Sequence, residues 1–133
     1  MKPQNDPERL FALMHEIISA REDWETTLAP RVILGLWHPR FILAAMKIMP
    51  YLRRSYIGAS ITLARDYFWD SCQAFSLKFA ALATTEGARF RWVIVLCSKP
   101  RRVSDDPARK DAQAAGKDIL VWTVNKPEQM MEV

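Results

Sequence analysis

Arg31-Val-Ile-Leu-Gly-Leu-Trp37 is a short, unbroken apolar run that follows Pro30 and stops before Pro39. Further runs of this kind occupy residues 55–60, 72–76 and 118–124. Continuous apolar runs of this length are typical of strands that are buried on both faces of a parallel sheet. The sequence therefore predicts four strands.

The segments between these runs carry apolar residues at helical spacing. Apolar stripes with a three-to-four-residue period lie at 7–18, 39–50, 63–69 and 78–90, and Pro127 begins a last helix. Asp6 followed by Pro7 supplies an N-cap and a first-turn proline for the first helix, while 23–30 reads as a polar connection.

Strands that alternate with helices predict an α/β fold with a parallel sheet and right-handed crossovers. Four strands fit either a small doubly wound sheet or about the last half of a (β/α)8 barrel. The sequence contains neither GxGxxG nor GxxxxGK, which disfavours the nucleotide-binding doubly wound option. A complete TIM barrel needs about 250 residues, nearly twice the 133 present. We therefore expect a partial TIM barrel.

One interval is too long for a single crossover. Between the strands at 72–76 and 118–124 lies Trp92-Val-Ile-Val-Leu-Cys97, a β-like run, and then a polar stretch. Without residues 92–109, the flanking segments join into one amphipathic helix. We therefore interpret 92–109 as an insertion that protrudes and leaves the two strands as direct neighbours.

Composition limits the class of protein. The chain has 50% hydrophobic residues and a net charge of +4, values that fit one globular domain over residues 1–133. Its basic residues are scattered rather than gathered in a stripe with aromatic residues, so we expect no nucleic-acid partner. The N-terminal residues do not resemble a signal peptide and no apolar run could span a bilayer, so we expect an intracellular protein, cytoplasmic or peripheral to a membrane.

The usual catalytic patterns are missing from the sequence. His15-Glu16 begins like HExxH, but position 19 is serine, and no GxSxG motif occurs. Cys72 and Cys97 stand in separate apolar runs, and we expect both to be buried, reduced thiols. Spacing alone predicts no catalytic residue and no metal ligand.

The carboxyl ends of the predicted strands carry the candidate site. Ligands of parallel α/β proteins bind at these ends. Trp37 and His38, Ser60, and Trp122 and Asn125 follow the first, second and fourth strands, so we expect them near one rim. Each tryptophan could line a pocket there or fill the layer between sheet and helices, and the residues alone leave both readings open.

Several segments resemble a known family. Gly116-Lys-Asp-Ile-Leu-Val-Trp-Thr-Val-Asn125, followed by Pro127-Glu128, is similar to the last barrel strand of the glycerophosphodiester phosphodiesterases. Leu34-Gly-Leu-Trp-His-Pro-Arg-Phe41, Tyr56-Ile-Gly-Ala-Ser60 and Asn5-Asp-Pro-Glu-Arg-Leu-Phe11 resemble the phosphatidylglycerol phospholipase C-like branch. The resemblance implies an incomplete TIM barrel, from the fourth helix to the start of the eighth.

The resemblance also implies a function. Family members hydrolyse glycerophospholipids or glycerophosphodiesters with Mg²⁺ or Ca²⁺ and two acid–base histidines, which lie in His-Arg-Gly and His-Asp motifs. This sequence has neither motif, so we expect it to be inactive alone and to bind no metal itself. By the same resemblance, Lys2, Trp37, His38, Trp122 and Asn125 are the expected substrate-binding residues.

Three hypotheses follow from these observations. The chain could be a fragment of a phospholipase C-like phosphodiester hydrolase, or a catalytically inactive half-barrel that pairs with another barrel half as an interaction module. It could also be an unrelated basic binding protein, although the run of family-like motifs argues against this.

Overall fold

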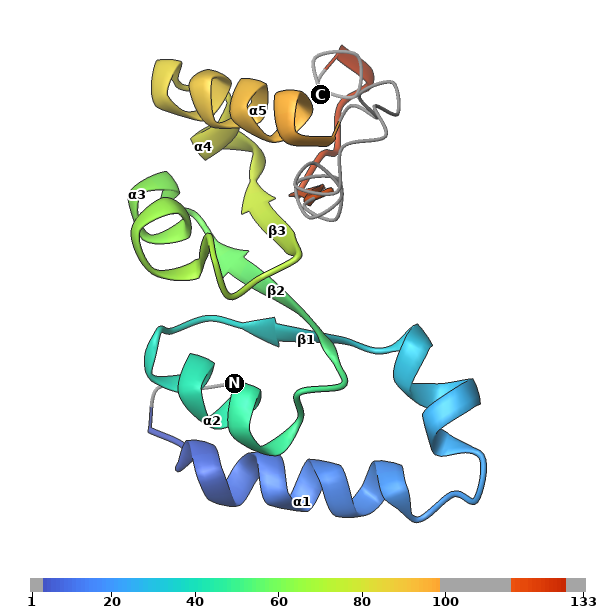
Figure 1. Ribbon diagram of the computed structural model, residues 1–133. Coiled ribbons are helices and arrows are strands. Elements are labelled where there is room, and N and C mark those ends of the chain that lie inside the picture. Colours follow the sequence, from blue (N-terminus) through green and yellow to red (C-terminus); the bar gives the residue numbers. More distant parts are fainter. Residues whose placement is uncertain (1–3, 99–115, 129–133) are drawn as a thin grey trace, which may run out of the picture.

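The computed structural model describes residues 4–98 and 116–128 of the chain (Figure 1). Its strands are β1 (Ile33–Leu36), β2 (Arg53–Gly58), β3 (Ala74–Lys78) and β4 (Asp118–Trp122). Its helices are α1 (Pro7–Ser19), α2 (Arg40–Ile48), α3 (Ile61–Leu63), α4 (Phe79–Leu82) and α5 (Thr85–Ser98). Shorter helical turns are η1 (Trp24–Leu28), η2 (Ala29–Arg31) and η3 (Ala64–Phe68).

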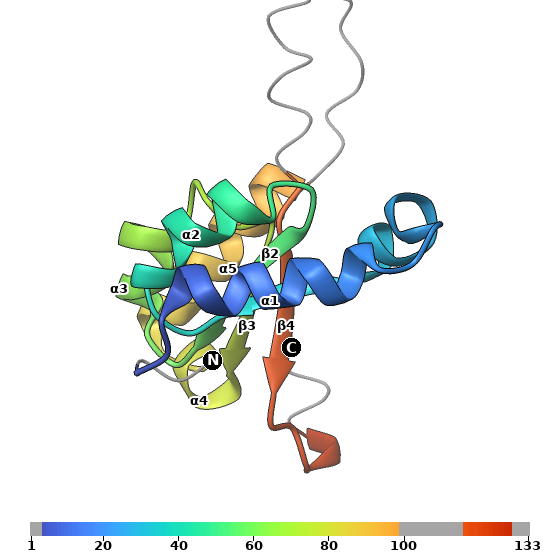
Figure 2. The same ribbon diagram turned by 90° about the horizontal axis from the view of Figure 1, so that it is seen from below.

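The four strands form one parallel sheet in the order β1-β2-β3-β4. Ile33 pairs with Arg53, Ser55 pairs with Ala74, and Ala74 pairs with Asp118. Figure 2 shows β3 and β4 side by side and running in the same direction. The predicted α/β class and the four parallel strands are confirmed, with strand boundaries displaced by about two residues.

Local chemistry explains where α1 begins. The carboxylate of Asp6 accepts hydrogen bonds from the backbone N–H groups of Glu8, at 3.0 Å, and Arg9, at 3.4 Å. Pro7 occupies the first turn, where its missing N–H costs nothing. The helix start expected from the sequence is confirmed.

The helices cover one face of the sheet. Leu34 and Leu36 of β1, Tyr56 of β2, and Phe75 and Leu77 of β3 alternate on this face and are buried. They pack with helical residues in one core, in which Phe11 of α1 meets Phe41 of α2 edge to face. Burial of each such large side chain contributes about 1.5–3 kcal/mol. Figure 1 shows α1 and α2 below β1 and α4 and α5 above β3, all outside the curve of the strands.

The opposite face of the sheet, the open face, is not covered by any described helix. Strand alternation and register place on it Ile33, Gly35, Trp37, Arg53, Ser55, Ile57, Ala74, Ser76, Lys78, Asp118, Leu120 and Trp122. Ile33, Trp37 and Leu120 remain 44%, 49% and 48% exposed, although all three are large and apolar. This one-sided arrangement is compatible with part of a barrel, whose helices form the outer ring.

Three segments differ from the sequence-based expectation. Residues 24–31 form the helical turns η1 and η2 rather than a plain connection. The helix expected over 78–90 breaks between α4 and α5, and α5 then continues through residues 92–98, which we had expected to be β-like. The strand propensity of this apolar run is overridden because it continues a helix already begun at Thr85, and propensity is only a weak prior. Of the proposed insertion, 99–109 lie outside the described residues.

A close approach of backbones explains the break between α4 and α5. The hydroxyl of Thr84 accepts a hydrogen bond from the Gly87 N–H at 3.0 Å and so caps the start of α5. A Cβ atom on Gly87 would collide with backbone atoms of Ala81 and Leu82. The lack of a side chain at this position therefore lets α5 turn back onto α4.

The Gly87→Ala variant tests this close approach, because the helix propensity of alanine would raise the free energy of unfolding whereas a clash with α4 would lower it. In an open helix, replacing glycine by alanine stabilises by about 0.5–1 kcal/mol. Here we expect a loss of about 1–3 kcal/mol, because the backbone of α4 must move. Urea unfolding monitored by circular dichroism measures the change. A variant as stable as the parent chain would contradict the close packing of α4 and α5.

Cys72 and Lys117 connect the beginnings of β3 and β4. Cys72 is 1% exposed, which confirms the prediction of a buried thiol, whereas the side chain of Cys97 lies outside the described part. The ammonium group of Lys117 donates hydrogen bonds to the carbonyl oxygens of Trp69 and Cys72. It also lies 5.0 Å from the centre of the Trp69 ring. Lys117 therefore anchors β4 to the turn before β3.

Burial raises the pKa of the Cys72 thiol to about 11 from an ordinary value of 9.0. In the Cys97→Ser variant we expect slow alkylation at pH 8, because little thiolate forms in the folded chain. The folded state also holds this proton more tightly than the unfolded state does. Its contribution to stability is therefore complete below pH 9 and is lost as the pH rises towards 11. Alkylation at the rate of a free thiol would contradict this environment.

Candidate functional site

Two tryptophans meet at the carboxyl end of the open face. Trp37 follows β1 directly, and Trp122 is the last residue of β4. Their ring centroids lie 6.3 Å apart with the ring planes tilted by 52°. Since β1 and β4 are the two outer strands of the sheet, the sheet must curve enough to bring these side chains together. We call this feature the tryptophan pair.

The environment of Trp122 distinguishes it from its partner. Trp37 is half exposed, whereas the indole N–H of Trp122 is buried and has no hydrogen-bond acceptor in the described part of the chain. A buried donor without an acceptor costs about 1–3 kcal/mol. The Trp122 indole is therefore held in place by packing and not by a hydrogen bond to a described residue.

Lys78 supplies a positive charge beside the tryptophan pair. It is the last residue of β3 and lies in register with Trp122 on the open face. Its side chain is exposed and makes no ion pair or hydrogen bond with any described residue. Sequence reasoning missed Lys78, because only the strand register shows that it shares a face and a row with Trp122.

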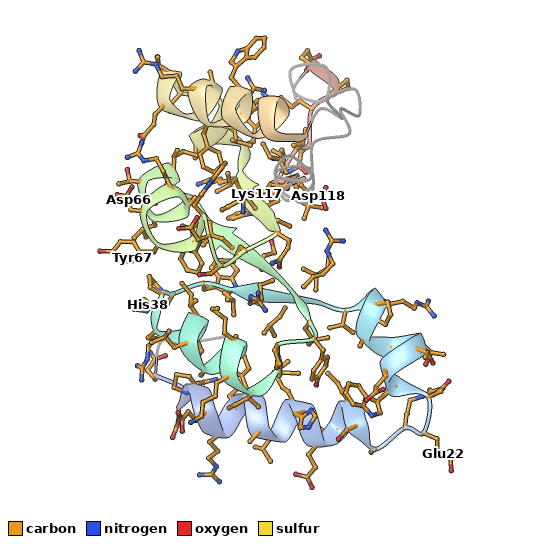
Figure 3. All side chains as sticks on the ribbon, in the orientation of Figure 1. Glu22, His38, Asp66, Tyr67, Lys117 and Asp118 are labelled. Carbon is orange, nitrogen blue, oxygen red and sulfur yellow. The ribbon has the colours of Figure 1, made fainter. Side chains whose placement is uncertain are left out.

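His38 and Ser60 both accept hydrogen bonds from backbone N–H groups at the starts of helices. His38 is exposed, and its Nδ1 accepts a hydrogen bond at 3.2 Å from the backbone N–H of Arg40, at the start of α2. The hydroxyl of Ser60 accepts one at 3.2 Å from the N–H of Leu63 and caps α3. Figure 3 shows His38 at the junction of β1 and α2, apart from Lys117 and Asp118 at the start of β4.

Asn125 and Lys2 are the remaining residues expected at the site. Asn125 is exposed and lies three residues beyond the end of β4. Lys2 lies outside the described residues. Of the five substrate-binding residues expected from the sequence, the structure therefore brings Trp37 and Trp122 into contact.

The amino end of the open face is charged but neutralised. The guanidinium group of Arg53 lies 2.6 Å from the carboxylate of Asp118, and both side chains are about half exposed. An exposed pair of this kind contributes at most about 1 kcal/mol. Among the described residues of this face, Lys78 at the carboxyl end is therefore the charge that has no ion-pair partner.

Comparison with family models, curated proteins and solved structures gives no match to this chain. The side chains around the tryptophan pair are also a poor donor set for Mg²⁺ or Ca²⁺, which take oxygen ligands. Within residues 4–98 and 116–128, no group of three or more histidine, cysteine, aspartate or glutamate side chains is placed to hold a metal ion. None of the described helices is both long enough and apolar enough to cross a membrane.

Contact between the two indoles predicts a measurable optical coupling. Transitions of two indole rings at 6.3 Å and a 52° tilt mix, and this gives a paired positive and negative band in the far-ultraviolet circular dichroism spectrum. We expect Trp37→Phe and Trp122→Phe to remove the same paired band. Trp92→Phe, on the exposed side of α5, is the matched control. If the two single variants lose different bands, the rings are not in contact.

Proposed function

We propose that this chain forms the substrate-holding part of a phospholipase C-like barrel of the glycerophosphodiester phosphodiesterase type. Its substrates would be glycerophospholipids or glycerophosphodiesters. The observation that carries the proposal is the tryptophan pair with Lys78 beside it, at the carboxyl ends of parallel strands. Ligands of parallel α/β folds bind at these ends.

The architecture supports a partial TIM barrel. Neighbouring strands are consecutive in the sequence, all pairs are parallel, and the described helices cover one face. Helices on both faces would favour a doubly wound sheet instead. Curvature that brings side chains of the outer strands β1 and β4 within 6.3 Å also favours a barrel wall over a flat open sheet.

The side chains around the tryptophan pair suit a phosphodiester with an apolar part. The Lys78 ammonium group would pair with the phosphate. The indole faces would pack against the glycerol backbone or the acyl chains. A neutral ligand would gain little from Lys78.

Hydrolysis is not assigned to these residues. The sequence contains neither the His-Arg-Gly nor the His-Asp motif that the resemblance associates with acid–base catalysis. Mg²⁺ or Ca²⁺ would need oxygen ligands, which the tryptophan pair and Lys78 do not provide. In this proposal the reacting groups and the metal belong to the other half of the barrel, so the chain binds the substrate without cleaving it.

Binding of dihexanoylphosphatidylglycerol tests the proposal. Isothermal titration calorimetry below the micelle concentration should give saturable binding, whereas dihexanoylglycerol, which lacks the phosphate, should bind more weakly. We expect Lys78→Gln to lower the affinity for the phospholipid by about three- to fivefold, as for an exposed ion pair. Trp122→Ala should lower the affinity for both ligands, because it removes the apolar contact that the indole ring makes with each.

The matched control is Lys47→Gln, which removes the same charge from α2 on the other side of the molecule. It should leave the affinity unchanged. Equal effects of Lys78→Gln and Lys47→Gln, or equal binding of the phospholipid and the neutral diglyceride, would show that no phosphate site exists beside the tryptophan pair.

A second candidate function is an inactive half-barrel that acts as an interaction module. The open face favours it, because Ile33 and Leu120 are large, apolar and about half exposed. The outer edges of β1 and β4 pair with no described strand, and such edges recruit other strands. Light scattering distinguishes the two candidates. A stable assembly in the absence of phospholipid favours the module, and a monomer that binds the phospholipid favours the substrate-holding role.

A further inference from the structure

A cleft of about 470 Å³ lies in the helical layer, between the α3–η3 segment and α5. Ile61, Trp69 and Phe90 form its apolar wall, and Trp69 meets Phe90 edge to face with ring centroids 5.8 Å apart. The polar part of the lining comes from Arg65 of η3 and from Thr85, Glu86 and Arg89 in the first two turns of α5. The volume is in the range of small-molecule sites, and the mixture of an apolar wall with few polar groups is typical of them.

Two cations and two carboxylates lie in or beside the lining, and they are paired unevenly. Glu86 accepts a hydrogen bond from the hydroxyl of Thr62 at 3.3 Å and lies 3.8 Å from the Arg65 guanidinium group. Arg65 also pairs with Asp66 at 3.0 Å, so its charge is compensated. The exposed side chain of Arg89 forms no ion pair or hydrogen bond with any described residue. Beside its apolar wall, the cleft therefore presents one guanidinium group that has no ion-pair partner among the described residues.

We propose that this cleft binds a small acidic amphiphile, a molecule with one carboxylate head and a compact apolar tail, such as a medium-chain fatty acid. The tail packs against Ile61, Trp69 and Phe90, and the carboxylate accepts hydrogen bonds from Arg89. Arginine suits this role because its planar guanidinium group binds a carboxylate with two parallel hydrogen bonds. A neutral ligand would leave Arg89 unpaired, and a cationic ligand would be repelled by it.

This site is independent of the proposed function. The cleft lies among the helices on the covered face of the sheet, whereas the tryptophan pair and Lys78 lie on the open face. A chain that fails to bind phosphatidylglycerol could therefore still bind a ligand in the cleft. Failure of ligand binding in the cleft would likewise say nothing about the tryptophan pair.

Sodium octanoate is the probe, and 1-octanol is the neutral comparison with the same chain length. Amide chemical shifts on titration should move in α3, η3 and the first turns of α5, and octanoate should bind more tightly than octanol. Because Arg89 is exposed, Arg89→Gln should weaken octanoate binding by about three- to fivefold and should leave octanol binding unchanged. Arg9→Gln, which removes the same charge from the exposed face of α1, is the matched control and should change neither affinity.

Two further variants keep the test decisive. Glu86→Gln removes the acidic group of the lining and should strengthen octanoate binding. Thr85→Trp fills the cleft from an exposed position and should abolish binding of both ligands while circular dichroism shows a retained fold. The proposal is overturned if octanoate does not saturate, if octanol binds equally well, or if Arg9→Gln and Arg89→Gln have the same effect.

Discussion

The packing of four parallel strands against a single layer of helices holds the other features of this molecule in place. Leu36, Tyr56 and Phe75 form one row across three strands, and each is at most 2% exposed. Because side chains alternate along a strand, burying this row sends the intervening residues to the open face. The tryptophan pair and Lys78 lie on the open face as a consequence. A shift of any strand by one residue would move its open-face side chains to the covered face, and so into the core.

Curvature of the sheet is the second consequence of this one-sided packing. The helices lie outside the curve of the strands, and the curve brings Trp37 and Trp122 together from opposite edges. At the start of β4, Lys117 holds the strand against the carbonyl groups of Trp69 and Cys72. The position of Trp122 therefore depends on contacts made at the far end of its own strand.

The covered and open faces present different chemistry. On the open face, Lys78 lies in register with Trp122, and the neighbouring apolar side chains are solvent-exposed. Within the covered side, η3 and α5 leave a cleft in which Arg65 pairs with two carboxylates, whereas the Arg89 side chain pairs with no described residue. In both places a cation that pairs with no described residue lies near a tryptophan, and an anionic oxygen is the group that would pair with it.

The sequence by itself determined the elements of this fold, because apolar runs such as 31–37 and signals such as Asp6-Pro7 act within a few residues. It also placed Trp37 and Trp122 at strand ends. Only the tertiary structure decided that these rings touch, since contact depends on sheet curvature. In the structure, His38 and Ser60 accept hydrogen bonds from backbone N–H groups at the starts of α2 and α3. Residues 92–98 are helical despite their β-like pattern. That Lys78 and Arg89 pair with no acid in residues 4–98 and 116–128 is also visible only in the tertiary structure, because ion pairing depends on distances between segments far apart in the chain.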